Sequence, residues 1–241
     1  MNKCYQVKAA ANKTADIFIY GDIVSKKWDE SDVTATAIKN ELDALGDVST
    51  LNVYINSGGG SVFEGLAIYN LLKRHPAHVN VHIDGLAASI ASIIVMAADT
   101  VYMPSNAIFM IHEPWVMTSG NAQALERMIA TLKQTTEAMM NAYLERTGDK
   151  LEREQLAAML AKESWLTAAE CVQYGFADVI TEELPYIAAS ISNEVKAHIK
   201  HIPAELTEPK NNDQAERQAL LAEIKNIPNT NYYDTMKKGI Y

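Results

Sequence analysis

Short apolar runs alternate with amphipathic stretches along most of the chain. Buried-strand patterns occur at residues 17–20, 51–55 and 79–83, and they are rich in β-branched and aromatic side chains. Apolar residues at helical spacing follow the first two runs, at 31–45 and 62–73. Strands that alternate with helices are typical of βαβ units, with parallel strands and right-handed crossovers. The pattern therefore predicts an α/β fold built on a mainly parallel sheet.

The ends of the first two predicted helices carry local signals. Ser31 or Asp32 could cap the start of the first helix. The second helix is expected to end before His75-Pro76, because the residue before a proline disfavours the helical conformation.

The pattern continues with one long helix among shorter elements. A helix is expected directly after Ser89. A second helix is expected at 120–146. This second helix is longer than the globular average, so it either crosses the domain or projects from it. Thr167 and Glu170 have the spacing of a capping box at the start of the last of these helices. The remaining predicted elements are strands at 100–103, 107–111 and 176–180 and helices at 152–161 and 167–174.

Composition divides the chain into a globular part and a polar end. Apolar residues make up 48% of the chain and charged residues 21%, which is ordinary for a globular protein. After about Glu182, charged and amide residues dominate. We therefore expect an N-terminal arm at 1–15, a domain at 16–184 and an extension at 185–241, partly flexible or ordered by a partner. Residues 213–225 could form an amphipathic helix within the extension.

Charge and cysteine content exclude several classes of protein. The formal net charge of -9 argues against a general affinity for nucleic acid or an anionic membrane surface. Cys4 and Cys171 form no CxxC pair, and no His/Cys cluster has the spacing of a zinc site. The N-terminus has no apolar run like that of a signal peptide, and the run after Ser89 is too short to span a bilayer. We expect a soluble, cytoplasmic protein with free thiols and no metal.

Ser89 lies where an expected strand runs into an expected helix. The stretch 85–89 reads Gly-Leu-Ala-Ala-Ser. A serine at such a junction exposes its hydroxyl, and the first free N–H groups of the helix point at whatever approaches. The small residues let a substrate or another backbone come close. A plain helix N-cap is the alternative interpretation.

Acyl-transfer hydrolysis needs a nucleophile, a base, a group that orients the base, and donors for the oxyanion. Ser89 can be the nucleophile, and the backbone N–H of Ile90 can be one oxyanion donor. The glycines at 58–60 follow a predicted strand, at the sheet edge where active sites of such folds lie. Gly59 or Gly60 can supply the second donor, although a tight turn also explains these glycines.

His112 and Glu163 complete the candidate set. His112 follows the predicted strand at 107–111, and Glu163 lies in a short link between two helices. A structural histidine and an exposed linker glutamate are the alternative interpretations. The other serines and histidines considered fit turn, core or tail positions better: Ser57, Ser61, Ser92, His75, His78, His82, His198 and His201.

Five short motifs occur in the order seen in Clp-type serine proteases. The resemblance covers about residues 16–182, and the chain is most similar to the phage and prophage branch, the head maturation proteases related to ClpP. It implies a ClpP/crotonase-like spiral of βαβ units, with the helix at 120–146 as a protruding handle. The motifs are Asn56-Ser57-Gly58-Gly59-Gly60, Gly85-Leu86-Ala87-Ala88-Ser89, Met110-Ile111-His112-Glu113-Pro114, Ser164-Trp165-Leu166-Thr167-Ala168-Ala169-Glu170 and Tyr174-Gly175-Phe176-Ala177-Asp178.

The resemblance implies a role for each candidate residue. Ser89 corresponds to the nucleophile, His112 to the base, and Glu163 to the orienting acid, where the best-known members carry aspartate. The oxyanion donors correspond to the backbone N–H groups of Gly60 and Ile90.

The resemblance also implies a substrate loop and partners. Gly58, Gly59 and Ser61 correspond to the substrate-binding loop, with Gly58 where the family commonly has proline. Members form homo-oligomeric rings, often stacked in pairs, that enclose their active sites and act on proteins or peptides without a cofactor. The segment before Ile17 is short, so an ATPase unfoldase is not expected as a partner.

The sequence thus predicts an ATP-independent serine endopeptidase with a Ser-His-Glu triad. We expect it to process phage capsid or scaffold proteins during head maturation, in the host cytoplasm if a phage encodes it. Three alternatives stay open at this stage: a general Clp-type protease that works with an ATPase unfoldase, a crotonase-like acyl-CoA enzyme, and an inactive ring-forming assembly protein.

Overall fold

A parallel sheet with helices against it forms the described part of the chain. The computed structural model describes residues 8–9, 13–29 and 31–182. The strands are β1 (Lys8–Ala9), β2 (Thr14–Tyr20), β3 (Thr50–Ser57), β4 (His78–Ala88), β5 (Thr100–Pro104), β6 (Ile108–Ile111), β7 (Ser164–Leu166) and β8 (Val179–Thr181). The helices are α1 (Ala35–Ala44), α2 (Val62–Lys73), α3 (Ile90–Val95), α4 (Ala122–Thr147), α5 (Arg153–Lys162) and α6 (Ala168–Tyr174), with a 3₁₀ turn η1 (Gly148–Lys150). The predicted α/β class with a mainly parallel sheet is confirmed.

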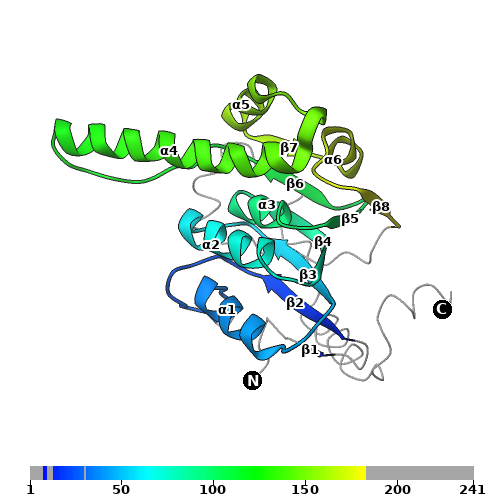
Figure 1. Cartoon of the computed structure of the whole chain (residues 1–241). Helices are drawn as coiled ribbons and strands as arrows, with labels where there is room; N and C mark the ends of the chain where they lie inside the picture. The colour runs from blue at the N-terminus through cyan, green and yellow to red at the C-terminus, as the bar shows by residue number, and fades with distance from the viewer. Residues whose placement is uncertain (1–7, 10–12, 30, 183–241) are drawn as a thin grey trace, which may run out of the picture. The chain divides into compact units, whose positions relative to one another are not determined.

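The sheet order is β1-β2-β3-β4-β5-β8, and β6 and β7 branch from it beside β4 (Figure 1). Strands β2, β3, β4, β5 and β8 pair in parallel, whereas β1 pairs antiparallel with β2 at the edge. The long strand β4 pairs first with β5 and then, over Leu86–Ala88, with β6. The end of β4 therefore lies beside the end of β6, where the predicted nucleophile and base follow.

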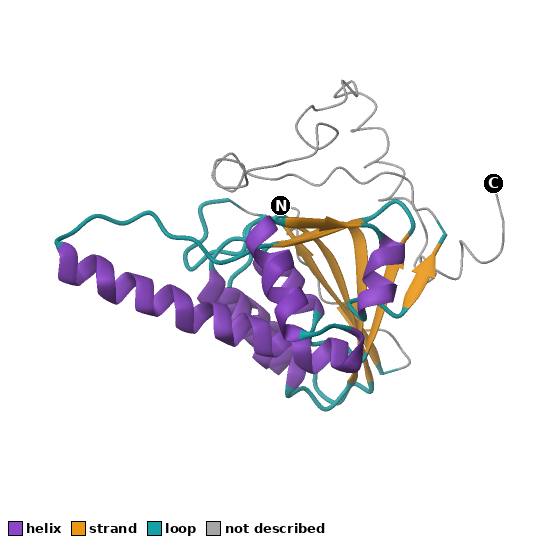
Figure 2. Cartoon of the chain, turned by 90° about the horizontal axis from the view of Figure 1, so that it is seen from above, coloured by secondary structure: helices purple, strands orange, loops and turns teal. Residues whose placement is uncertain are grey.

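Alternate residues of the central strands form the core beneath the helices. Figures 1 and 2 show α1, α2 and α3 gathered on one face of the sheet. Branched apolar side chains of β2 to β5 are fully buried on this face because the strand period of two points them all the same way. They include Ile17, Ile19, Val53, Ile55, Val81, Ile83 and Val101.

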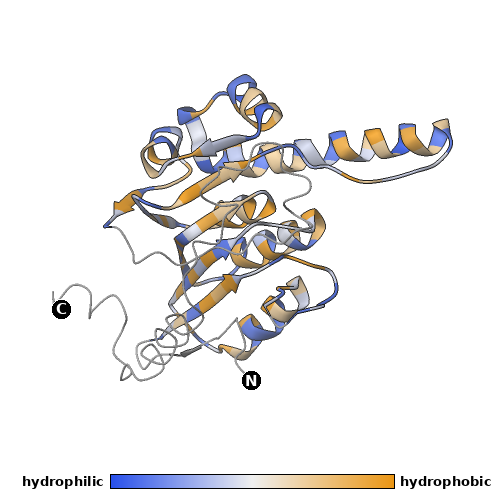
Figure 3. Ribbon diagram, turned by 180° about the vertical axis from the view of Figure 1, so that it is seen from behind, coloured by the Kyte–Doolittle hydropathy of each residue, from blue (hydrophilic) through white to orange (hydrophobic). Residues whose placement is uncertain are grey.

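Helix α4 is half packed and half exposed. Its buried residues all lie between Thr135 and Thr147. Its N-terminal half extends past the other elements, and Leu125 and Ile129 expose 39% and 53% of their surface there. Figure 3 shows apolar and polar positions alternating along this half. Of the two predicted possibilities, the helix projects.

Two helix starts test the capping predictions. Thr34, and not Ser31 or Asp32, caps α1, and its side chain accepts the Ala37 N–H. The prediction was wrong because Asp32 accepts two backbone N–H groups of the preceding turn instead. The capping box predicted at the start of α6 is confirmed.

Strands β4 and β7 are among those that differ from the sequence prediction, and β8 begins at Val179, three residues after the predicted start. The predicted strand at 79–83 continues to Ala88, because Leu86–Ala88 pair with β6 and stay extended. Strand β7 was not predicted, because Ser164–Leu166 is too short to show a period. Its pairing with β6, and not local propensity, makes it extended.

Several predictions concern segments at the two ends. β1 and the first residues of β2 lie within the segment 1–15 that we predicted as an arm. Residues 185–241, the predicted helix at 213–225 and Cys4 lie outside the described residues. Across the ranges that the structure describes, no helix has the length and apolar character needed to cross a membrane.

Candidate active site

Ser89 occupies a sharp turn between β4 and α3. Its backbone has φ 54° and ψ −129°, a conformation that residues other than glycine rarely adopt. The turn is held at both ends, since the Ser89 N–H donates to the Met110 carbonyl at 2.9 Å and its carbonyl accepts the Ser92 N–H at 3.0 Å. The result is a hydroxyl that projects from the end of the sheet.

The Ser89 hydroxyl lies within hydrogen-bond distance of an imidazole. Ser89 Oγ is 2.6 Å from Nε2 of His112. The sheet register explains the contact, because Ala88 of β4 pairs with Met110 of β6. Ser89 follows Ala88 directly, and His112 lies two residues after Met110. The structure therefore brings the predicted nucleophile and the predicted base together.

The antiparallel pairing of β6 with β7 places Glu163 opposite His112. Ile111 pairs with Ser164, so the next facing positions are His112 and Glu163. Glu163 ends helix α5 with φ 58°, and its N–H donates to the Leu160 carbonyl at 3.2 Å. His112 and Glu163 are both buried, with 7% and 9% exposed.

Burial and charge act in opposite directions on the imidazole. Burial lowers the pKa of His112, and the neighbouring Glu163 carboxylate raises it by a smaller amount. The net pKa of His112 lies below its ordinary value, so the imidazole is neutral and can accept a proton at neutral pH.

The glycine loop lies directly against the Ser89 turn. Gly59 has φ +100°, and a Cβ placed there would lie 2.7 Å from the Ser89 Cβ and 3.2 Å from the Ile90 nitrogen. Gly60 has φ +138°, and a Cβ there would overlap the backbone of Ile23. Only glycines allow this close approach.

Ser57 determines which of the two candidate backbone N–H groups of the loop, Gly59 or Gly60, is available as an oxyanion donor. Its hydroxyl is fully buried, donates to the Gly21 carbonyl at 2.6 Å and accepts the Gly59 N–H at 3.1 Å. The Gly59 N–H is therefore already bonded, and Gly60 is the more exposed of the two glycines. The sequence predicted a turn role for Ser57 and gave no sign that its hydroxyl bonds to the Gly59 N–H.

Gly58 and Ser61 are the other residues of the predicted substrate-binding loop. Gly58 is buried. Ser61 precedes α2, and its N–H donates to the Ile23 carbonyl at 2.6 Å. Ile23 N–H in turn donates to the Gly59 carbonyl at 2.8 Å. The loop is thus bonded through Gly59 and Ser61 to Ile23, which lies outside the strands and forms an isolated bridge with Gly60.

The rival residues have other contacts. His82 stacks between Tyr54 and Tyr102, with ring centroids 4.8 and 4.7 Å away. His78 Nδ1 lies 3.6 Å from the Asp99 carboxylate. Among the residues that the structure describes, no group of three or more His, Cys, Asp or Glu side chains could hold a metal ion.

Comparison with known proteins agrees with this geometry. Residues 1–184 match the family described as Clp protease. The ATP-dependent Clp protease proteolytic subunits of Streptococcus pneumoniae strains Hungary19A-6 and CGSP14 are each 33% identical over 143 residues. The match covers 58% of this chain and 72% of each relative. The chain therefore belongs to the Clp protease family and is a serine endopeptidase.

Proposed function

We propose that the chain hydrolyses peptide bonds with Ser89 as nucleophile, His112 as general base and Glu163 as the acid that orients the base. The 2.6 Å distance between Ser89 Oγ and His112 Nε2 carries the proposal. It is the distance at which a proton moves directly between a hydroxyl and a neutral imidazole.

The reaction proceeds in two halves. Ser89 Oγ attacks the scissile carbonyl carbon while its proton moves to His112 Nε2. The imidazolium then protonates the leaving amine as the C–N bond breaks, which leaves an acyl ester on Ser89. A water that loses its proton to His112 hydrolyses this ester and restores the serine. Glu163 keeps the other imidazole proton on Nδ1 and stabilises the imidazolium.

The backbone N–H groups of Gly60 and Ile90 hold the oxyanion in this proposal. The Gly59 N–H is bonded to Ser57, which leaves Gly60 as the donor of the loop. The Ile90 nitrogen lies beside the same loop. Two donors that converge on one point stabilise the charge of the tetrahedral intermediate. Gly58, Gly59 and Ser61 line the approach to these donors as the substrate-binding loop.

The substrates we propose are capsid or scaffold proteins of a phage, in the host cytoplasm, with the enzyme assembled as a ring. The resemblance of the sequence to the head maturation branch supports these substrates, while the order of the motifs supports the family as a whole. The chemistry consumes no nucleotide, so hydrolysis needs no ATP unless a partner must first unfold the substrate. The pneumococcal relatives are named ATP-dependent, which makes a general Clp-type protease with an unfoldase the second candidate. The family match argues against the crotonase-like alternative.

A fluorophosphonate probe tests the nucleophile. We expect the probe to label the wild type at Ser89 and not to label Ser89→Ala, because the probe phosphonylates only an activated serine. Ser49→Ala, which removes an exposed hydroxyl just before β3, is the matched control and should label like the wild type. Equal labelling of Ser89→Ala and wild type would refute the assignment.

Digestion assays test the substrate and the role of ATP. Purified capsid and scaffold proteins and unfolded casein are incubated with the enzyme, with and without ATP and an unfoldase. We expect cleavage without ATP that depends on Ser89. Cleavage of folded substrates only with an unfoldase and ATP would favour the second candidate. The absence of Ser89-dependent cleavage of every substrate would favour an inactive assembly protein.

A further inference from the structure

Two buried hydroxyl groups lie behind the Ser89 turn. Ser92, one turn into α3, is fully buried, and its hydroxyl donates to the Ser89 carbonyl. Ser92 Oγ is also 2.6 Å from the hydroxyl of Tyr143, which comes from the packed half of α4 and is fully buried. These groups join the long helix to the proposed nucleophile.

The direction of the bonds follows from counting protons. A serine hydroxyl carries one proton, and Ser92 gives it to the Ser89 carbonyl. Tyr143 must therefore donate to Ser92. Burial raises the pKa of Tyr143 far above its ordinary value, so the phenol keeps its proton. The chain of donors runs from Tyr143 through Ser92 to the carbonyl of Ser89.

The accepting carbonyl belongs to a functional peptide unit. The Ser89 carbonyl and the Ile90 N–H lie on one planar peptide group and point in opposite directions. A bond that fixes the carbonyl therefore also fixes the direction of the N–H, which is one of the two proposed oxyanion donors.

A helical serine often bonds back to a carbonyl of its own helix without any functional effect. Two observations distinguish Ser92 from that case. The carbonyl belongs to Ser89, whose φ of 54° needs support from its surroundings. A second hydroxyl, from a helix 51 positions along the chain, reinforces the bond.

We propose that Ser92 and Tyr143 are positioning residues for catalysis. They hold the Ser89–Ile90 peptide plane so that the Ser89 hydroxyl meets His112 and the Ile90 N–H faces the oxyanion. The proposal rests on the assignment of Ser89 as nucleophile. Because the oxyanion forms only during the reaction, loss of this support lowers kcat and leaves KM unchanged.

Ser92→Ala, Tyr143→Phe and the double variant test the proposal. We expect Ser92→Ala to lower kcat for a peptide substrate and the rate of phosphonylation of Ser89 by about tenfold. Tyr143→Phe should have a smaller effect, and the double variant should match Ser92→Ala, because Tyr143 acts through Ser92. The acidic limb of the pH–rate profile should stay in place, since neither hydroxyl contacts His112.

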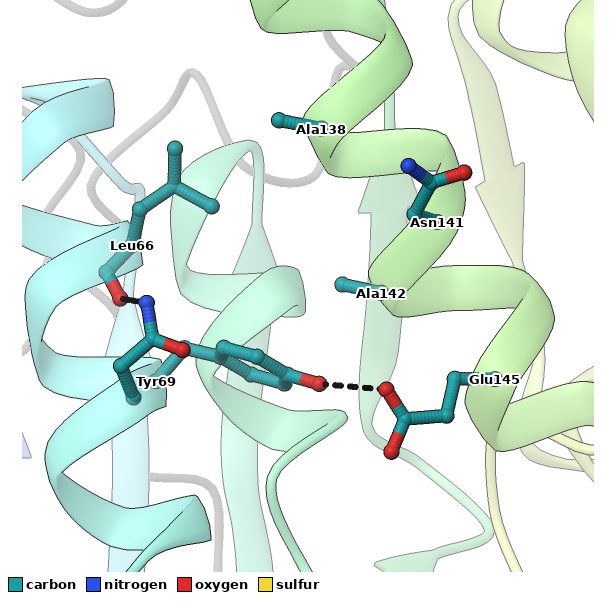
Figure 4. Close-up of a pocket in the computed structure, with 7 residues that line it drawn as sticks. Leu66, Tyr69, Ala138, Asn141, Ala142 and Glu145 are labelled. Carbon is teal, nitrogen blue, oxygen red and sulfur yellow. Dashed lines mark hydrogen bonds between the residues drawn. The ribbon is translucent and has the colours of Figure 1, made fainter.

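Tyr69→Phe is the matched control. Tyr69 of α2 faces α4, and its hydroxyl lies 3.4 Å from Glu145 across a pocket that Ala138 and Ala142 help to line (Figure 4). The variant removes a tyrosine hydroxyl between α2 and α4, but it leaves the Ser89 turn untouched. We expect wild-type kcat.

Three results would overturn the inference. Wild-type rates in both Ser92→Ala and the double variant would show that the support is not needed, while labelling of Ser89 would leave the nucleophile assignment intact. If the loss of activity in the variants equals the loss of folded protein measured by thermal unfolding, the role of Ser92 and Tyr143 is structural. Absence of wild-type labelling at Ser89 would overturn the nucleophile assignment and the inference with it. If Ser92→Ala does not fold, the double variant, which has no unpaired hydroxyl, supplies the test.

Discussion

At the scale of single residues, the site depends on unusual backbone conformations. Lys13, Ser89 and Glu163 are the non-glycine residues with positive φ in the described part of the chain. Two of these three belong to the proposed triad. Such conformations cost free energy and persist only where the surroundings determine them, which is common at active sites.

The role of Glu163 predicts a specific effect on pH dependence. The acidic limb of kcat/KM reports protonation of His112, because only the neutral imidazole accepts a proton. The Glu163 charge raises the pKa of His112, so Glu163→Gln should lower that pKa and move the acidic limb to lower pH. We also expect kcat to fall on the order of 100-fold or more, because the amide does not fix the imidazole tautomer.

Glu113→Gln is the control for this variant. Glu113 is exposed and follows His112 directly, so its replacement removes a nearby carboxylate outside the buried site. It should leave kcat and the pH profile as in the wild type. A shift of the acidic limb of Glu163→Gln to higher pH would contradict the electrostatic role of Glu163.

At the scale of secondary-structure elements, helix α2 positions the helix that follows Ser89. Gly65 of α2 is buried, and a Cβ there would overlap the side chain of Ile90, the first residue of α3. The absence of a side chain lets the two helices approach closely, and this contact fixes the position of Ile90, whose N–H is a proposed oxyanion donor.

Gly65→Ala weighs propensity against packing. Alanine favours a helix over glycine by about 1 kcal/mol, whereas overpacking of a core contact costs about 1–3 kcal/mol. We expect net destabilisation of about 1 kcal/mol in denaturant unfolding, together with reduced kcat because Ile90 must move. Asn70→Ala, at an exposed position of the same helix, should change stability by less than about 0.5 kcal/mol. Stabilisation by Gly65→Ala would show that Ile90 can shift freely.

At the scale of the whole molecule, the sheet that carries the proposed active site also carries a buried carboxyl group that takes no part in the proposed mechanism. Asp84 on β4 is 8% exposed and bonds to the Tyr20 hydroxyl. Burial raises the pKa of Asp84 to about 6, and the bond from Tyr20 opposes this rise. The folded protein thus favours the protonated carboxyl.

Asp84 predicts a fall in stability as the pH rises. Between its unfolded pKa of about 4 and its folded pKa of about 6, the folded state binds more protons, so the free energy of unfolding decreases with pH. Asp84→Asn should therefore raise stability at pH 7.5 by on the order of 2 kcal/mol and change little at pH 4. Thermal unfolding at both pH values measures the effect. Asp43→Asn, at an exposed site, is the control, and lower stability of Asp84→Asn at pH 7.5 would contradict the prediction.

The exposed half of α4 predicts assembly of the proposed rings. Leu125 and Ile129 lie one turn apart on one face of the projecting helix and are exposed. Replacement of both by glutamate should reduce the sedimentation coefficient and leave the circular dichroism spectrum unchanged. Gln134→Glu adds charge at an exposed polar position and should sediment like the wild type. Unchanged sedimentation of the double variant would argue against assembly through this helix.

Much of the fold could be predicted from local patterns. The bounds of α2 are those that the sequence predicted, 62–73, and the order of strands and helices agrees except for β1 and β7. The motifs around Ser89 and His112 located the proposed nucleophile and base. The contact of Ser92 with Tyr143 had no sequence signal, because residues 51 positions apart meet only through helix packing.

The sequence by itself determined the α/β architecture and the residue types for acyl transfer, because strand and helix periods and strand-end motifs are local. Only the tertiary structure decided that these residues meet. Ser89 reaches His112 through the register of β4 with β6, and the pairing of β7 with β6 places Glu163 opposite His112. Pairing of this kind is a property of distant segments, and no local pattern encodes it.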